Sequence, residues 1–265
     1  MKTFSAIAAI ALSLGCSQQV VNLTPPVTAQ TILDVKGDGS IQNPVKCSPT
    51  IGNGGNYEEG SLRLMGKCER GGTTPKTATE SNNKYLTFNT SGIPGRGNDR
   101  GELAYTPMLA FDKTYTISYQ FRIPEGTPVH PRGQMFYPLQ VWQCSPLSPI
   151  AGMRLVQGTS HEVDFMVRSQ NSNTPVIARQ KLQPGKWHQI ELTMRPSLGK
   201  GGLYSVKVDG KPLGTYRGPF GADPKRCSPA RTTPSWRLKL GIYRTNNPGR
   251  QYKVDYDNIK LVRIN

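Results

Sequence analysis

Acidic residues, histidines and long apolar runs are all scarce in this sequence. Of 265 residues only 17 are Asp or Glu, against 33 Lys or Arg, and three are His. The resulting formal net charge of +16 favours a polyanionic partner. No zinc-finger spacing, helix-turn-helix pattern or aromatic RNA-binding motif accompanies the charge, which argues against nucleic acid as that partner.

The one extended apolar stretch lies at the N-terminus. Phe4–Leu14 follows Lys2 and is too short to span a bilayer, so residues 1–16 are expected to form a signal peptide. Cys16 stands where a bacterial lipoprotein would be cleaved and lipidated, but Ser13 replaces the usual leucine, and ordinary cleavage nearby is an equal alternative. We expect a monomer without a membrane span that is secreted, periplasmic or lipid-anchored.

Cysteine is also infrequent, with five in the chain. If Cys16 is removed or lipidated, an even number remains, which suggests two disulfides in an exported protein. Three connectivities are possible. We expect pairing in sequence order, Cys47–Cys68 and Cys144–Cys227, with buried free thiols as the alternative. No Cys or His pair has the spacing of zinc ligands, so a zinc site is not expected.

The sequence shows no sustained helical period, and Gly and Pro separate short segments of β character. Asp209-Gly210 between two such segments favours a hairpin. These features predict an all-β fold, a two-sheet β-jelly-roll sandwich with a concave basic groove, over residues 34–265 after an unstructured lead-in over 17–33. Ile51–Glu80 is expected to be irregular, and Gly218–Pro234 to form a loop bordering the groove. The expected strands are Lys84–Asn89, Tyr115–Ile123, Phe136–Gln143, Gly152–Val156, Glu162–Arg168, Val176–Arg179, Trp187–Met194, Leu203–Val208, Trp236–Tyr243 and Lys253–Val262.

The segment 236–244 is the most informative one. Alternation places apolar side chains on one face, which suits a core, and a polar set on the other. The apolar face holds Trp236, Leu238, Leu240 and Ile242, and the polar face holds Arg237, Lys239, Gly241 and Tyr243. The polar face therefore presents two cations and a phenol to an anionic chain.

Two further segments carry similar polar faces. Arg100 and Glu102 share one face of an expected strand, and Gln140 lies between Tyr137 and Trp142 in another. In order and approximate spacing, the three segments resemble the polysaccharide lyases built on a β-jelly roll, which include alginate lyases, heparin lyase I and glucuronan lyases. Alginate lyases carry R-x-E, Q-I-H and Y-F-K-x-G-x-Y, where this chain reads R-G-E, Q-V-W and W-R-L-K-L-G-I-Y. The resemblance runs from about residue 85 to 265.

This resemblance implies a role for individual residues. Tyr243 matches the catalytic tyrosine of the G-x-Y segment. Gln140 and Arg100 match the residues that grip the uronate carboxylate, and Lys239 matches a lysine that contacts substrate. Glu102 is expected to hold Arg100 or a neighbouring cation in place rather than to act as a base. The substrate implied is a uronic-acid polysaccharide.

The chemistry of a uronate lyase suits these residue types. β-Elimination requires that the enzyme neutralise the carboxylate, remove the C5 proton and protonate the leaving O4. Neighbouring cations lower the pKa of a tyrosine, which favours Tyr243 as the proton carrier. The alternative is that Tyr243 only stacks on sugar rings. Arg237, Tyr137 and Trp142 are expected to bind substrate beside it.

One departure from the family pattern concerns histidine. Trp142 stands where alginate lyases have the histidine of Q-I-H, so glucuronan-like polymers are favoured over alginate as substrate. Among the three histidines, His188 is expected to be structural. His161 could reach a sheet face and touch substrate, and His130 could border the groove.

No cofactor is required by this chemistry. A structural calcium ion at Asp255 and Asp257 is conceivable, because some family members carry one, although no loop has EF-hand spacing. Two other functions compete with the lyase. The first is a noncatalytic carbohydrate-binding protein of the same fold. The second is a glycoside hydrolase, for which only Glu162 and Asp164 offer a pair of carboxylates.

Overall fold

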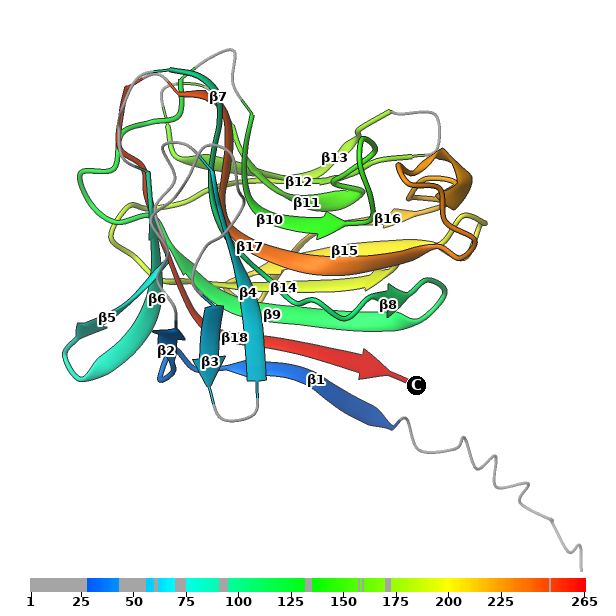
Figure 1. The fold of residues 1–265 in the computed structure, drawn as a ribbon, viewed down its shortest axis with the longest axis horizontal. Helices are drawn as coiled ribbons and strands as arrows, with labels where there is room; N and C mark the ends of the chain where they lie inside the picture. Colours follow the sequence, from blue (N-terminus) through cyan, green and yellow to red (C-terminus); the bar gives the residue numbers. More distant parts are fainter. Residues whose placement is uncertain are drawn as a thin grey trace, which may run out of the picture.

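The computed structural model describes residues 28–42, 56–59, 62–69, 75–90, 95–131, 135–156, 158, 160–169, 173–247 and 249–265. They form two antiparallel sheets that pack against each other, as the sequence predicts (Figure 1). Within the described residues the single helix is a short 3-10 turn, Pro224–Arg226. No helix in the described part of the chain has the length and apolarity needed to cross a membrane.

The eight-stranded sheet has the order β16-β15-β14-β9-β18-β6-β5, and β1 also pairs with β18. Its strands are β1 (Ala29–Val35), β5 (Lys76–Glu80), β6 (Asn83–Asn89), β9 (Thr114–Arg122), β14 (His188–Arg195), β15 (Leu203–Val208), β16 (Lys211–Arg217) and β18 (Lys253–Ile264).

The ten-stranded sheet has the order β13-β12-β11-β10-β17-β7-β4-β3-β2, and β8 also pairs with β17. Its strands are β2 (Ser40–Gln42), β3 (Asn56–Glu59), β4 (Leu62–Glu69), β7 (Gly95–Ala104), β8 (Leu109–Ala110), β10 (Phe136–Trp142), β11 (Ala151–Leu155), β12 (Glu162–Val167), β13 (Val176–Lys181) and β17 (Ser235–Asn247).

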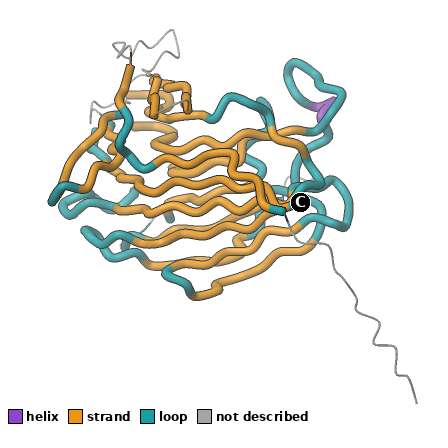
Figure 2. The backbone as a smooth tube through the Cα atoms, turned by 90° about the horizontal axis from the view of Figure 1, so that it is seen from below, coloured by secondary structure: helices purple, strands orange, loops and turns teal. Residues whose placement is uncertain are grey.

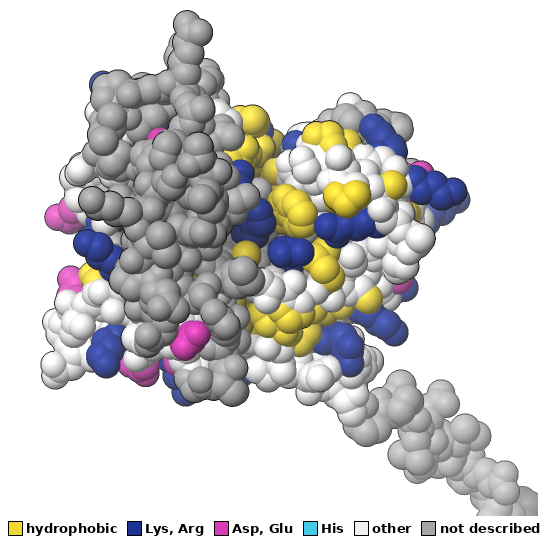
Figure 3. All heavy atoms as spheres, viewed as in Figure 1, with side chains coloured by type: hydrophobic (Ala, Val, Ile, Leu, Met, Phe, Trp, Pro, Cys, Tyr) yellow, Lys and Arg dark blue, Asp and Glu magenta, His cyan; other side chains and the backbone are white. Residues whose placement is uncertain are grey.

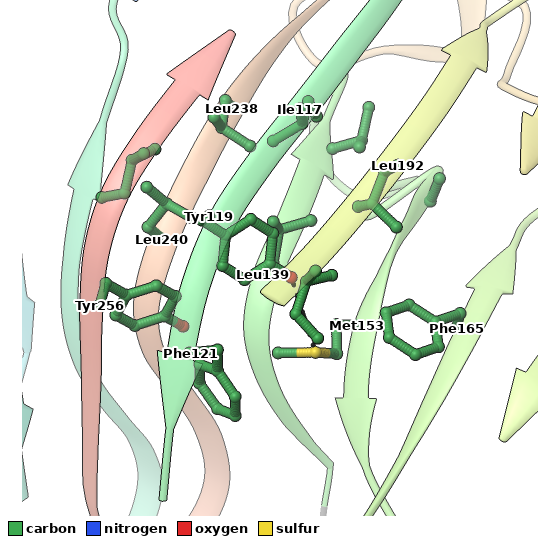
Figure 4. Packing of buried hydrophobic residues seen from close by; sticks show 14 of the residues in the cluster. Ile117, Tyr119, Phe121, Leu139, Met153, Phe165, Leu192, Leu238, Leu240 and Tyr256 are labelled. Carbon is green, nitrogen blue, oxygen red and sulfur yellow. Dashed lines mark hydrogen bonds between the residues drawn. The ribbon is translucent and has the colours of Figure 1, made fainter. Parts of the chain in front are cut away.

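The core lies between the sheets and is built by alternation. Leu139 of β10, Met153 of β11 and Leu240 of β17 point inward and meet Tyr119 of β9 and Tyr256 of β18 (Figure 4). Their side chains are 2% exposed or less. Every second residue of β17 consequently points outward, which produces the polar face that the alternation of 236–244 predicts.

All ten strands listed from the sequence are present, but two expectations were wrong. Ile51–Glu80, expected to be irregular, contains β3, β4 and β5. β5 is the outermost strand of its sheet and is largely exposed, so its side chains do not show apolar alternation. The lead-in ends earlier than residue 33, because β1 pairs with β18 from Ala29 and buries Leu33.

The expected Asp209-Gly210 hairpin joins β15 and β16. Val208 pairs with Lys211, and both turn residues have positive φ, 50° and 75°. This geometry belongs to a two-residue turn that matches the twist of antiparallel strands. Asp209 also fastens the turn to β14 by accepting hydrogen bonds from His188 and from the backbone of Gln189, each at 2.9 Å.

The loops collect at the ends of the strands (Figure 2). The loop 218–234 contains the 3-10 turn and is tied to the loop after β10 by a disulfide between Cys144 and Cys227. This is one of the two expected pairings. The other cannot be followed, because Cys47 and the side chain of Cys68 lie outside the described residues.

Candidate active site

Most of the expected site residues meet on the outward face of β7, β17 and β10, three adjacent strands of the ten-stranded sheet. Register places Tyr243 opposite Arg100 on β7 and opposite Tyr137 on β10, and Lys239 opposite Gln140. A pocket of about 290 Å³ opens over them. It is lined by Arg100, Gln140, Trp142, Cys144, Ser145, Pro146, Ser148, Lys239 and Tyr243.

Glu102 lies at the centre of the polar network. Its side chain is buried, and one carboxylate oxygen lies 3.2 Å from Nε of Arg100. The other oxygen accepts a hydrogen bond from the amide of Gln140. A buried carboxylate that pairs with a guanidinium and accepts from an amide is fixed in position and in turn fixes both groups. Glu102 thus holds Arg100, as the sequence predicts, and it also orients Gln140.

Tyr243 lies between a cation and a second aromatic ring. The guanidinium carbon of Arg100 is 4.5 Å from the centre of the Tyr243 ring, and the Tyr137 ring is stacked on it with 6.3 Å between centroids. The Tyr137 hydroxyl donates to the sulfur of Met135 at 3.6 Å. These contacts leave the phenol of Tyr243 in the pocket and hold its ring in one orientation.

Trp142 is surrounded by positive charge. Lys239, Arg237 and Arg231 lie over its ring at 4.8, 5.1 and 5.6 Å from the centroid. Burial lowers the pKa of Arg237 from its ordinary value, and the nearby charge of Arg231 lowers it further. The positive charges of Arg237 and Arg231 repel each other. A bound anion beside them would therefore be stabilised.

The loop 218–234 forms a wall beside Trp142, in agreement with its expected place at the groove. Arg231 donates to the backbone carbonyl of Gln143 at 3.1 Å. The side chain of Gln143 makes two hydrogen bonds to the backbone of Ala222, of 2.6 and 2.8 Å. Together with the Cys144–Cys227 disulfide, these bonds hold the loop against the end of β10.

Several residues at the pocket were missed by sequence reasoning. Ser145 and Ser148 come from the loop after β10, and Arg231 from the loop 218–234. The expected Cys144–Cys227 disulfide was the one sequence signal for these residues. It predicts that the loop after β10 and the loop 218–234 lie close together. It could not show which side chains face the pocket.

Arg244 does not belong to the site, although it follows Tyr243 directly. It continues the inward face of β17, is fully buried, and pairs with Asp99. Its guanidinium also lies 4.5 Å from the centre of the Tyr252 ring. The cation that contacts the Tyr243 ring is Arg100.

None of the three histidines lines the pocket. His188 is buried, accepts a hydrogen bond from the backbone of Gln183 and contacts Asp209, which confirms its expected structural role. His130 is also buried, against the rings of Phe136 and Tyr252, so its expected place at the groove was wrong. His161 precedes β12, and β11 separates that strand from β10.

Three other carboxylates considered from the sequence have cationic or amide partners. Asp255 is buried and pairs with Arg122 at 2.9 Å, and Asp257 accepts a hydrogen bond from Asn83 at 2.8 Å. Among the described residues no cluster of His, Cys, Asp or Glu could hold a metal ion, so these residues do not support the conceivable calcium site. Asp164, one of the two carboxylates for a hydrolase, is bound by two arginines, which disfavours that function.

Two solved structures are similar to this chain in fold. The endo-beta-1,4-glucuronan lyase from the fungus Trichoderma reesei superposes with a TM-score of 0.58 at 14% identity, over 74% of this chain and 89% of that one. Alginate lyase Aly36B superposes with a TM-score of 0.52 at 8% identity, over 75% of this chain and 85% of that one. No curated protein matches the chain by sequence.

At such identities the two superpositions show the β-jelly-roll fold alone. The sequence gives the family directly, because residues 46–260 match the family model described as "Polysaccharide lyase". That match covers most of the chain, and we conclude that this protein belongs to the polysaccharide lyase family and is an enzyme of that class.

Proposed function

We propose that the enzyme cleaves a uronic-acid polysaccharide by β-elimination in the pocket over β7, β17 and β10. The observation that carries the proposal is the meeting of Arg100, Gln140, Lys239 and Tyr243 in one pocket. Three of these side chains can donate hydrogen bonds to a substrate carboxylate, and the fourth can carry a proton. Lys and Arg side chains gather with hydrophobic ones over β10 and β17 (Figure 3). Such a surface suits sugar rings that bear negative charge.

In the proposed reaction, Arg100 and the second N–H of the Gln140 amide hold the uronate carboxylate. They stabilise the negative charge that develops when the C5 proton leaves. Tyr243, as phenolate, takes that proton. The electrons of the broken C5–H bond form the C4–C5 double bond, and the C4–O4 bond breaks. The proton passes from Tyr243 to the leaving O4, so no other reactant is consumed.

The stereochemistry of this reaction favours one group of substrates. No histidine lines the pocket, and we assign the roles of base and acid both to Tyr243. One side chain can do so only when the C5 proton and O4 lie on the same face of the sugar ring. Glucuronate and mannuronate meet this condition, whereas guluronate and galacturonate do not. Together with Trp142 in place of the family histidine, this supports a glucuronan-like polymer as substrate.

The test is incubation of the purified protein with glucuronan, polymannuronate, polyguluronate and polygalacturonate. Unsaturated products absorb ultraviolet light, so their absorbance measures elimination directly. We expect product from glucuronan first and from polymannuronate second. Fastest turnover of polyguluronate or polygalacturonate would contradict the single-tyrosine mechanism. Binding without any unsaturated product would favour the noncatalytic alternative.

We also propose that the enzyme is exported. Support comes from Lys2 and the apolar stretch 4–14 in the sequence, and from the Cys144–Cys227 disulfide, which suits an oxidising compartment. Mass spectrometry of the mature N-terminus from culture medium and from membranes would test this. A lipidated Cys16 would identify an anchored form, whereas an intact N-terminus in the cytoplasmic fraction would contradict export.

A further inference from the structure

A second pocket lies on the outward face of the same sheet. Arg154 of β11 is directly opposite Asp164 of β12, which is directly opposite Arg179 of β13. A cavity of about 250 Å³ lies over the three side chains, with Leu155 and Val156 completing its lining. The function assigned to the first pocket does not use these residues.

The three side chains form a rigid cluster with excess positive charge. Asp164 is 2% exposed, and its two oxygens accept hydrogen bonds from Arg179 at 2.7 and 3.2 Å and from Arg154 at 3.0 Å. One carboxylate cannot neutralise two guanidiniums. Glu162 adds a negative charge near Arg179, but Lys181 lies opposite it and offsets that charge.

The arginines keep donors available for a ligand. The side chains of Arg154 and Arg179 are 29% and 53% exposed. Among the described residues, Arg154 bonds through Nη2 alone and Arg179 through Nε and Nη2, so the remaining N–H groups are uncommitted. Guanidinium groups held in place by a buried carboxylate are preorganised to bind a second carboxylate.

The sheet surface connects this cluster to the active site. Gly152 of β11 pairs with Gln140 of β10, which lines the first pocket. Because Gly152 has no side chain, nothing projects from this position between the two pockets. A Cβ atom there would come within 2.4 Å of the carbonyl oxygen of Leu139, so only glycine fits. β10, β11 and β12 are neighbours about 4.8 Å apart, which places Asp164 roughly 10 Å from β10. A polysaccharide lying across the strands spans that distance with a few sugar units.

We propose that Arg154 and Arg179, positioned by Asp164, form a distal subsite that binds the carboxylate of a uronosyl residue some sugars away from the bond that is cleaved. The inference rests on the proposed function of the first pocket. It implies that the enzyme prefers long chains, because only a chain that extends from Tyr243 across β11 can occupy both pockets.

The experiment measures kcat and KM for oligouronates of increasing length with Arg179→Gln, Arg154→Gln and wild type. Arg217→Gln is the matched control, because Arg217 is an exposed arginine on β16 of the other sheet. For oligomers long enough to reach the cluster, we expect Arg179→Gln and Arg154→Gln each to raise KM roughly fivefold with little change in kcat. For the shortest substrates, KM should equal that of wild type, as it should for Arg217→Gln at every length.

A KM that is unchanged at all lengths, or raised equally for the shortest and longest substrates, would overturn the subsite. A thermal unfolding transition checks that each variant is folded. If Arg154→Gln does not fold, the test relies on Arg179→Gln, because the Arg179 side chain is more exposed. If wild type yields no unsaturated product, the proposed function fails, and calorimetric titration with the same oligomers decides the subsite. A length-dependent loss of affinity in Arg179→Gln would support it, and equal affinities would overturn it.

Discussion

The hydroxyl of Tyr256 on the eight-stranded sheet donates a 2.6 Å hydrogen bond to the carbonyl of Pro138 on the ten-stranded sheet. Pro138 has no N–H, so β10 cannot complete its ladder there. The register between β10 and β17 shifts at this point, and Gly241, at φ 128°, lies in the irregularity. The buried phenol of one sheet thus supports the backbone beside Tyr243 in the other.

Tyr256→Phe should reveal that support. It leaves a buried carbonyl without its donor, so we expect a loss of about 1–3 kcal/mol in the free energy of unfolding. We also expect kcat to fall more than KM rises, because Tyr243 is two residues from Gly241. Denaturant unfolding and initial rates measure both. Tyr115→Phe, which removes a hydrogen bond to Ala110, is the control and should retain full turnover. An unchanged free energy of unfolding in Tyr256→Phe would contradict the argument.

Tyr243→Phe should separate proton transfer from binding. The variant keeps the ring that contacts Arg100 and Tyr137 but loses the hydroxyl. We expect kcat to fall by about 10²- to 10⁴-fold, with substrate affinity nearly unchanged. Tyr137→Phe is the matched variant and should retain most of the turnover. If the Tyr243→Phe enzyme were fully active, Tyr137 rather than Tyr243 would be the residue that carries the proton.

Glu102→Gln should disrupt the network without a change of shape. It removes the charge that holds Arg100 and replaces one of the two acceptor oxygens beside Gln140 by a donating NH2 group. We expect a stability loss of about 2–4 kcal/mol, because a largely buried guanidinium loses an ionic partner. Misplacement of both carboxylate-binding groups should lower kcat/KM about 100-fold. Glu191→Gln, at a half-exposed pair with Lys207, serves as control. Activity that survives in Glu102→Gln would show that Arg100 needs no such anchor.

Trp142→Ala should weaken substrate binding more than it slows the reaction. The ring is in contact with three cations, and it has no proton to transfer. Its removal frees those cations to move, so we expect KM to rise about tenfold with a smaller effect on kcat. A loss confined to kcat would instead place Trp142 in the chemical step.

The hairpin at Asp209 should make folding sensitive to acid. Partial burial raises the pKa of the Asp209 carboxyl, but the hydrogen bonds from His188 and Gln189 outweigh it, and the net pKa is below the usual 3.8. A lowered folded-state pKa stabilises the protein above the unfolded value, and this contribution is lost as pH falls through the folded one. Asp209→Asn should therefore reduce the slope of unfolding free energy below about pH 4. An identical acid profile would contradict this.

The sequence alone determined the features that depend on neighbouring residues. Alternation in 236–244 identified which side chains enter the core, and Asp209-Gly210 identified a turn, because both follow from local backbone geometry. β5 escaped notice because a strand at a sheet edge needs no apolar alternation. β4 was missed although Leu62 and Leu64 alternate with Arg63.

Only the tertiary structure decided which strands are neighbours, and with them the partners of each polar side chain. Gln140 and Glu102 are far apart in sequence and share a hydrogen bond because β17 lies between β10 and β7. The same strand pairing brings the Arg100 guanidinium over the Tyr243 ring. It also directs Arg244 into the core, where it forms an ion pair with Asp99. Such contacts depend on strand order and on a bulge at Gly241, which arise from packing the whole sandwich rather than from any local pattern.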